Sequence, residues 1–495
     1  MNRASLLMKN TLSISFGSIA MRAMGLYLQI YIASVISADV LGVFGLISTA
    51  YMIFVTLSLS GIRFCVTRMV AEEVSRESPY PKRLMNSAFL YSLFFGFLAL
   101  FSMWGLSHII AEKWIGAQEA MVPLKILALS LPFIPLNAAV EGYFTAKQKV
   151  KRIVFMQIFD QIIKILFIVA AFSLFADKIK NPCSALVAST TFGEIVSGII
   201  LLVLYYAEAW RKKTASRGNM RVITKTAFPL AVSSYMRTGL SSLGHMLIPR
   251  GLTMGGMQRS GAFVTYGIIH QMALPVLMFP SAILSALGEV LIPRLTEAQT
   301  QNKTIGISYI VNRAMRIGAI FSFSIAGYMF FYSQHLGDLI YKNMEAGYYI
   351  KLMAPLIPII YCDCVTDGCL KGLGQQLQCM IYNILEAAIN IALLMLLLPR
   401  IAILGYLITM YIKEIFNFAL SFRRLCKITT VEIDGAALLS VVLASFGAKF
   451  LCTFVTSSQS LWLLTVLYFI FYSFIIYISN SINRSDIKWI FEALK

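Results

Sequence analysis

Charged residues are scarce in this sequence: they make up 13% of its 495 residues, whereas apolar residues make up 58%. A soluble chain of this length needs far more polar surface to cover its core. The eight cysteines lie mostly in apolar stretches, and no CxxC pair has the spacing of a zinc site. We interpret them as small packing residues, with a redox or metal role as the alternative, and expect no metal site.

Catalytic motifs are missing as well. The sequence contains no Walker loop, no GxSxG, no HExxH and no polar stretch large enough for an ATPase domain. We therefore expect a protein that is not an enzyme and that holds no cofactor. Transport by such a chain would run on a Na⁺ or H⁺ gradient, the membrane potential or substrate flux.

Long apolar runs are what the sequence has in abundance, each long enough to cross the ~30 Å of hydrocarbon in a bilayer. Lipid offers no partner to backbone groups, so the runs must be helices, because they are too long and too uniformly apolar for barrel strands. The first run follows Arg3 and Lys9, as in a signal peptide, but it is too long and lacks a small-residue cleavage site. The sequence predicts an all-α integral membrane protein of about fourteen transmembrane helices. The expected spans are 11–36, 40–64, 84–110, 120–146, 153–176, 183–208, 224–249, 262–292, 306–333, 347–370, 376–399, 401–422, 435–455 and 460–480.

The basic residues cluster in alternate loops. If the N-terminus is cytoplasmic, the inner connections carry most of the lysines and arginines, as the positive-inside rule requires. We therefore expect an even number of helices with both termini in the cytoplasm. The net charge of +19 is then mostly a matter of topology, and it suits anionic membrane lipids as partners. Because no single soluble face gathers this charge, nucleic acid is excluded as a partner.

Twelve of the predicted helices fall into two sets of six that resemble each other. "SIAMRAMGL" in the first set matches "SSYMRTGLS" in the second, and "EGYFTAKQ" matches "DGCLKGLGQ". Six is an even number, so both copies face the same way, as in transporters built from parallel repeats around a central cavity. The predicted divisions are a lobe at 1–208, a basic cytoplasmic linker at 209–223, a lobe at 224–422 and an additional helix pair at 435–480.

Three arginines stand inside or at the end of predicted spans. Arg22 lies mid-way along the first helix, its repeat counterpart Arg237 mid-way along the seventh, and Arg63 near the end of the second. Charges inside a membrane are costly, so they should face the bundle interior or water. Guanidinium groups match phosphate oxygens, so these three predict a cavity that binds an anion such as a pyrophosphate. The alternative is a structural pair with a buried carboxylate, or an Arg63 that reaches to the interface.

Acidic and amide side chains suggest a second kind of site, for a coupling ion. Asp363 and Asp367 share a face of the tenth predicted helix, and Asn383, Glu386 and Asn390 form one polar stripe on the eleventh. Such groups carry protons or, with amide oxygens, a sodium ion. The alternative is hydrogen bonding between helices. Two further residues, Asp160 and Lys164, are four apart on the fifth helix and are interpreted as a structural pair.

Four stretches of the sequence are distinctive: "LGVFGLISTAYMIFVTLSLSGIRFCVTRMVAEE", "LALSLPFIPLNAAVEGYFTAKQ", "MALPVLMFPSAILSALGEVLIPRLTEA" and "APLIPIIYCDCVTDGCLKGLGQ". They resemble the polysaccharide transporter branch of the MOP flippase superfamily, and the likeness covers nearly the whole chain. Within the superfamily, the sequence is most like the stage V sporulation protein B group and its lipid II flippase relatives.

The resemblance implies a flippase of the bacterial cytoplasmic membrane, which moves a polyprenyl-pyrophosphate-linked sugar to the outer leaflet by alternating access. It also implies a cavity-facing arginine in the first helix, which Arg22 fits, and a lipid-tail groove at 435–480. The sequence departs from the family at Glu141, where arginine is frequent, and at His245, where an acidic or neutral polar residue is usual. The alternatives are a cation-coupled multidrug exporter of the MATE type and a membrane enzyme or scaffold without transport. The sugar, the coupling ion, the growth stage and the oligomeric state stay open.

Overall fold

The computed structural model describes residues 3–75, 82–147, 149–174, 181–209, 220–432, 435–455 and 460–479. Within these ranges all regular structure is helical, as the composition predicts. The chain forms two compact units: unit 1 comprises Met1–Ser34 and Ile268–Lys495, and unit 2 comprises Val35–Gly267. This grouping differs from the predicted division into lobes, because the first helix, which lies in the predicted lobe 1–208, belongs to unit 1. The repeat boundaries stay a prediction.

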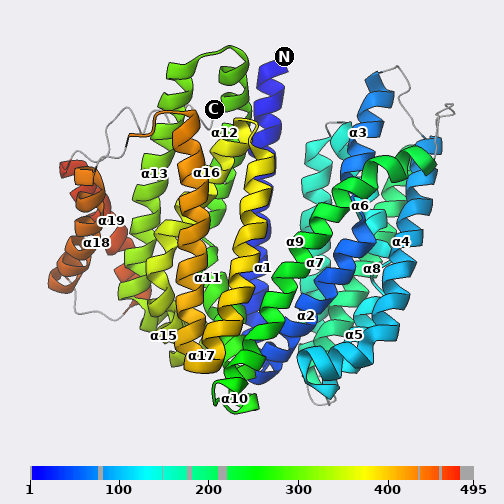
Figure 1. Ribbon diagram of the computed structural model, residues 1–495, viewed down its shortest axis with the longest axis horizontal. Coiled ribbons are helices and arrows are strands. Elements are labelled where there is room, and N and C mark those ends of the chain that lie inside the picture. Colours follow the sequence, from blue (N-terminus) through cyan, green and yellow to red (C-terminus); the bar gives the residue numbers. More distant parts are fainter. Residues whose placement is uncertain are drawn as a thin grey trace. The chain divides into compact units, whose positions relative to one another are not determined.

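Unit 2 is a bundle in which neighbouring helices run side by side (Figure 1). Its helices are α2 (Ala38–Leu59), α3 (Ile62–Ser75), α4 (Lys82–Ile109), α5 (Met121–Ala128), α6 (Phe133–Ala146), α7 (Val150–Leu174), α8 (Pro182–Ala209), α9 (Met220–Met254) and α10 (Arg259–Gly267). A π-helical turn, η1 (Ile110–Ile115), and a 3₁₀ turn, η2 (Gln118–Ala120), connect α4 to α5.

Unit 1 contains the first helix and everything after α10. Its helices are α1 (Arg3–Val35), α11 (Leu274–Met278), α12 (Ser281–Thr300), α13 (Thr304–Phe331), α14 (Ser333–Tyr341), α15 (Met344–Met353), α16 (Ile357–Gly372), α17 (Gln376–Ile428), α18 (Gly435–Val455) and α19 (Leu461–Ile478). The π-helical turn η4 (Ile268–Ala273) leads into α11, and the 3₁₀ turn η5 (Ala354–Leu356) leads into α16.

Each predicted span falls mainly on helix, but the count of fourteen is not confirmed. Among the described residues, eleven helices are long and apolar enough to cross a membrane, or up to twelve if one bent pair is a single span. That pair is Gln118–Ala128 with Phe133–Ala146, bent by 43° next to Pro132. The predicted break between the spans 376–399 and 401–422 lies inside α17, where Ile401 and Ala402 have non-helical backbone angles.

Glycines allow equivalent helix pairs to pack closely in the two units. In unit 2, α6 crosses α3 at Gly142, where a Cβ would lie 2.8 Å from the carbonyl oxygen of Arg63. In unit 1, α16 crosses α12 at Gly368, where a Cβ would lie 2.9 Å from the Cα of Gly288. Gly142 and Gly368 are counterparts in the matched stretches, so this shared crossing supports the interpretation of an internal duplication.

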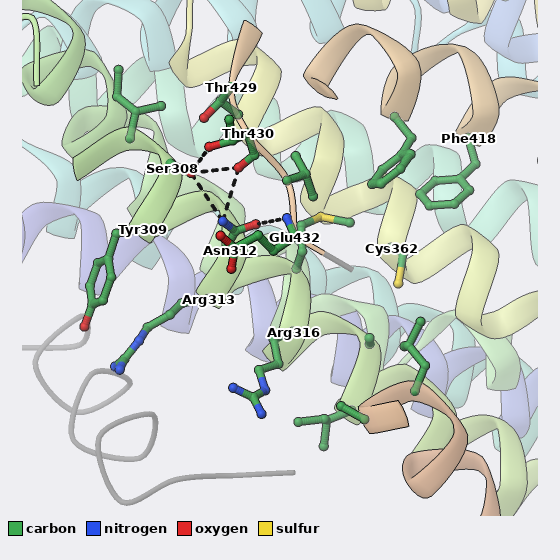
Figure 2. A pocket seen from close by; sticks show the side chains of 18 of the residues that line it. Ser308, Tyr309, Asn312, Arg313, Arg316, Cys362, Phe418, Thr429, Thr430 and Glu432 are labelled. Carbon is green, nitrogen blue, oxygen red and sulfur yellow. Dashed lines mark hydrogen bonds between the residues drawn. The ribbon is translucent and has the colours of Figure 1, made fainter. Parts of the chain in front are cut away.

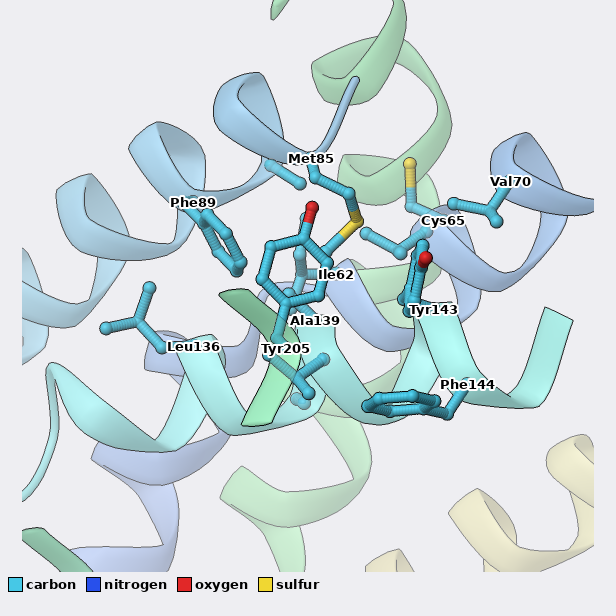
Figure 3. Packing of buried hydrophobic residues seen from close by; sticks show 14 of the residues in the cluster. Ile62, Cys65, Val70, Met85, Phe89, Leu136, Ala139, Tyr143, Phe144 and Tyr205 are labelled. Atoms are coloured by element: carbon cyan, nitrogen blue, oxygen red, sulfur yellow. The ribbon is translucent and has the colours of Figure 1, made fainter. Parts of the chain in front are cut away.

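The core of unit 2 gathers where α3, α4, α6 and α8 meet (Figure 3). Tyr205 packs edge-on against both Phe89 and Tyr143, with ring centroids 5.3 and 5.1 Å apart. Edge-to-face pairs of this kind fix the rotation of one helix against the next beyond what burial of apolar area achieves. The adjoining turn at Ser60 and Gly61 has positive φ angles of 40° and 73°, and it directs the chain into α3, which carries Arg63.

Candidate functional site

Arg22 is held in unit 1 by two neutral hydroxyl groups. Its guanidinium donates to Ser281 Oγ at 3.0 Å and to Ser285 Oγ at 3.2 Å, and the two serines lie one turn apart on α12. The side chain is exposed, and no described carboxylate lies within ion-pair distance of it. Glu289, one turn beyond Ser285, interacts with Arg22 only at longer range. The guanidinium is therefore held in one orientation, and its positive charge is available to bind an anion.

Arg237 lies on α9 in unit 2 and is also exposed. Its neighbour Thr238 accepts a side-chain hydrogen bond from Thr56 on α2, at 3.2 Å, which connects α9 to α2 at this level. No carboxylate among the described residues forms an ion pair with Arg237. Because Arg22 and Arg237 belong to different units, their convergence on one cavity stays a prediction.

Arg63 has a different environment from the other two arginines. Its Nη1 lies 3.3 Å from Glu141 Oε2, and Glu141 also accepts a hydrogen bond from Gln157 at 3.2 Å. The Arg63 side chain is 48% exposed and that of Glu141 is 17% exposed. The structure therefore shows the carboxylate pair that was the alternative for Arg63, and Arg63 is the partner of Glu141.

The predicted acidic residues of unit 1 lie along the contact between α16 and α17. Asp363 Oδ2 accepts a hydrogen bond from Asn417 at 2.9 Å, and Asp367 pairs with Lys371 at 3.1 Å. The hydroxyl of Ser421 interacts with the Asp363 carboxylate, but by strict geometry Asp363 Oδ1 and the Oδ1 of Asn417 are buried without a well-aligned hydrogen bond among the described residues. A buried oxygen without a hydrogen-bond partner raises the free energy of the folded state. A bound proton or small cation would give these oxygens a partner.

Glu386 binds a lysine that the sequence analysis did not select. Lys413 Nζ lies 3.1 Å from Glu386 and 2.7 Å from Glu414, and all three side chains are about one-fifth exposed. Lys413 stands mid-span at "YIKEIF", so a complete count of intramembrane charges would have found it. Asn383 and Asn390 are half-buried on the same helix as Glu386.

A cavity of about 1040 Å³ opens between α13, α16, the end of α17 and α18 in unit 1 (Figure 2). One end is polar: Ser308 and Asn312 bind the backbone of Thr430 at 2.7 and 3.2 Å, and Arg313 and Arg316 point into the same space. The remaining lining is mostly apolar. Residues of α18 that line it are Ala437, Leu438 and Val441. The cavity is thus amphipathic, and its polar end carries Arg313, Arg316 and Glu432.

The model of the polysaccharide biosynthesis protein family matches residues 7–299, which is more than half of the chain. The chain belongs to this family. As a polysaccharide biosynthesis protein, it is 21% identical over 467 residues to stage V sporulation protein B of Bacillus subtilis, covering 91% of the chain and 89% of the relative. It is 20% identical over 488 residues to the lipid II flippase MurJ of the same organism, covering 90% and 88%.

Solved structures show the same fold as this polysaccharide biosynthesis protein. The lipid II flippase MurJ in an inward closed conformation superimposes with a TM-score of 0.73 at 12% identity, covering 94% of the chain and 98% of that structure. An inward-facing MATE family transporter of the MOP superfamily superimposes with a TM-score of 0.66 at 11% identity, covering 84% and 98%. The predicted membership of the MOP superfamily is confirmed, and the fold is that of a multi-pass helical membrane protein.

Proposed function

We propose that this protein is an alternating-access flippase that moves a polyprenyl-pyrophosphate-linked sugar, a peptidoglycan precursor or a related polysaccharide unit, across the bacterial cytoplasmic membrane. The observation that carries the proposal is Arg22: an intramembrane guanidinium held by two serine hydroxyls and left without a carboxylate among the described residues. Such a group binds a phosphate oxygen pair in a bidentate manner. The name of one Bacillus relative, a lipid II flippase, supports the substrate class, and the name of the other, a stage V sporulation protein, supports a role in sporulation, which we place in spore cortex formation.

In this proposal Arg22 and Arg237 bind the pyrophosphate, and Arg63 has a secondary place because Glu141 already neutralises it. The amphipathic cavity beside α18 holds part of the lipid tail. Asp363, Asp367, Glu386, Asn383 and Asn390 form the region that couples flipping to H⁺ or Na⁺. Both termini are cytoplasmic, as the distribution of basic residues predicts.

The second candidate is a cation-coupled MATE-type exporter, which the fold alone also permits. An exporter of cationic compounds needs an acidic cavity, and an uncompensated Arg22 would repel its substrate. The flippase is therefore the better supported of the two.

Binding of lipid II to the purified protein in lipid nanodiscs tests the proposal. We expect Arg22→Ala to weaken binding by about 10- to 100-fold, because a charge-assisted hydrogen bond contributes about 1.5–3 kcal/mol. The double variant Arg22→Ala/Arg237→Ala should bind more weakly still. Arg68→Ala is the matched control, because Arg68 lies at the surface in a pair with Glu72.

Three outcomes separate the alternatives. Tight binding by the wild type and loss in the Arg22 variant support both the substrate class and the phosphate contact. Binding of another polyprenyl-linked sugar, but not of lipid II, keeps the class and removes the peptidoglycan assignment. Binding of cationic drugs alone contradicts the proposal and favours the exporter.

A further inference from the structure

Unit 2 contains a half-buried charge cluster that the proposed function does not use. Lys164 on α7 lies 2.8 Å from Asp160 Oδ2, one turn away, and it also forms an ion pair with Glu194 on α8. The three side chains are only 20–22% exposed, and both helices are candidate membrane spans. The predicted Asp160–Lys164 pair is thus part of a triad of two carboxylates and one ammonium group.

Unit 1 contains a cluster of the same composition, Glu386, Lys413 and Glu414 on α17. Glu386 belongs to the coupling region of the proposed function, so for unit 1 the inference rests on that function and deepens it. The carboxylates of both triads occupy matching positions in the sequence repeats. "QIFDQIIKI" aligns with "NILEAAINI", which pairs Asp160 with Glu386, at the same spacing that relates Gly142 to Gly368. "TFGEIVSG" aligns with "YIKEIFNF", which pairs Glu194 with Glu414 at a spacing of 220 rather than 226, because the connection between the two helices is shorter in unit 1.

The lysines, in contrast, come from opposite helices. The counterpart of Lys164 is Asn390, and the counterpart of Lys413 is Gly193. A Cβ at Gly193 would lie 2.9 Å from Cγ of Lys164, so the missing side chain on α8 leaves the room that Lys164 fills from α7. One ammonium between two carboxylates is thus retained while its point of attachment changes. If each triad only held two helices together, there would be no reason for the lysine to come from α7 in unit 2 and from the later part of α17 in unit 1. If the site requires two carboxylates and one ammonium group, the lysine can come from either helix.

Each triad carries one more negative than positive charge when all three groups are ionised. An excess charge inside a membrane costs several kcal/mol, which a bound proton removes. We propose that each triad is a proton-binding centre, in which two carboxylates share one ammonium group and one exchangeable proton. Proton binding converts one carboxylate to a carboxylic acid and leaves the lysine protonated.

Further titratable groups face the two centres. In unit 2, Tyr51 on α2 and Glu141 on α6 interact electrostatically with Glu194, and Glu141 is already paired with Arg63. In unit 1, Asp363 and Asp367 on α16 lie near the triad, and Asp367 is paired with Lys371. Asp363 is therefore a further carboxylate whose titration has to be separated from that of the unit 1 triad.

Infrared titration of the full-length protein in lipid nanodiscs tests the proposal by counting carboxylic acid groups as a function of pH. Glu194→Gln and Glu414→Gln should each remove one carboxylic acid, because a single carboxylate and the lysine then balance. Lys164→Met and Lys413→Met should each add one, because two carboxylates then lack a cation. Glu208→Gln is the control, because Glu208 contacts Lys147, Lys149 and Arg152 and stays ionised.

Moving the lysine of unit 1 to the position that corresponds to Lys164 tests whether the charges of the triad, rather than the packing around one lysine, determine the count of carboxylic acids. Lys413→Gly should raise the count by one, and Lys413→Gly/Asn390→Lys, which gives unit 1 the arrangement of unit 2, should return it to the wild-type value. Asp363→Asn in each background removes the contribution of Asp363.

An unchanged count in the folded glutamine variants would overturn the proposal and make the triads permanently ionised clamps. If a glutamine variant does not fold, Asp160→Asn or Glu386→Gln decides instead, because removing the other carboxylate of the same triad should remove the same single carboxylic acid. The measurement needs no lipid-linked substrate, so its result is independent of the proposed flipping activity.

Discussion

At the scale of single residues, the partners of an intramembrane arginine decide what it can do. Arg22 and Arg63 look alike in the sequence, but the first is bound by serine hydroxyls and the second by Glu141. A neutral partner orients the guanidinium and leaves its charge, whereas a carboxylate cancels it. This difference is the reason that Arg22, rather than Arg63, is central to the proposed anion site.

We predict that the Arg63–Glu141 pair contributes little to stability. Since Arg63 is 48% exposed, a double-mutant cycle with Arg63→Met and Glu141→Gln should give a coupling free energy of about 1 kcal/mol or less. Chemical unfolding in detergent measures it. In addition, Arg63→Met should weaken lipid II binding less than Arg22→Ala does, and a stronger effect at Arg63 would contradict the secondary place of Arg63 in the anion site.

The sequence predicts contacts within one helix better than contacts between helices. Asp160 and Lys164 are four apart, and their predicted pair is present in the structure. The second partner of Lys164, Glu194, lies on another helix. To predict this contact one must know how α8 is rotated about its axis relative to α7, and the spacing of apolar residues does not define that rotation. Lys413 was missed for a different reason: a complete count of intramembrane charges would have selected it, but its pairing with Glu386 across the break in α17 could not be predicted.

At the scale of helices, α2 and α10 of unit 2 cross in close contact. A Cβ at Gly42 would overlap the backbone of Phe263, and a Cβ at Gly267 would overlap that of Ala38. Small residues at such crossings let two backbones approach each other in a membrane. The helices themselves were predictable from apolar runs, but this crossing was not, because the sequence does not say which glycines face each other.

We predict that Gly42→Ala and Gly267→Ala each destabilise the protein by about 1–3 kcal/mol, the usual cost of forcing extra atoms into a packed contact. Gly105→Ala on α4 is the control, because a Cβ there has nothing within 4 Å, and it should be neutral or slightly stabilising. Thermal unfolding of the three variants provides the comparison. Equal melting temperatures for all three would show that the crossing is looser than the structure indicates.

The cavity beside α18 allows a test that separates the lipid tail from the headgroup. Ala319 lines the cavity, and Ala319→Trp should fill part of it. We expect this variant to lose affinity for full-length lipid II and to keep its affinity for a short-chain analogue, because only a long tail reaches the cavity. Nanodisc binding of both ligands measures the ratio. Equal loss for both ligands would place the tail elsewhere.

At the scale of the whole molecule, the composition and the positive-inside distribution predict a helical membrane transporter, and the family match and the shared fold agree with the membrane fold and the superfamily. The number of spans is less well defined, because α17 is continuous across a kink and α9 carries a charged residue mid-way. The division into compact units was not predictable either, because α1 and the helices after α10 are far apart in the sequence.

Translocation of a fluorescent lipid-linked sugar across the membrane of proteoliposomes, with reduction of outer-leaflet fluorophores as the readout, tests the central claim most directly. We predict that the wild type makes the lipid-linked sugar accessible far faster than protein-free vesicles do, and that an imposed H⁺ or Na⁺ gradient changes this rate. Arg22→Ala should reduce the rate to the background level, while Arg68→Ala should leave it unchanged. A wild-type rate equal to that of protein-free vesicles, under every gradient and with folded protein, would contradict the flippase assignment.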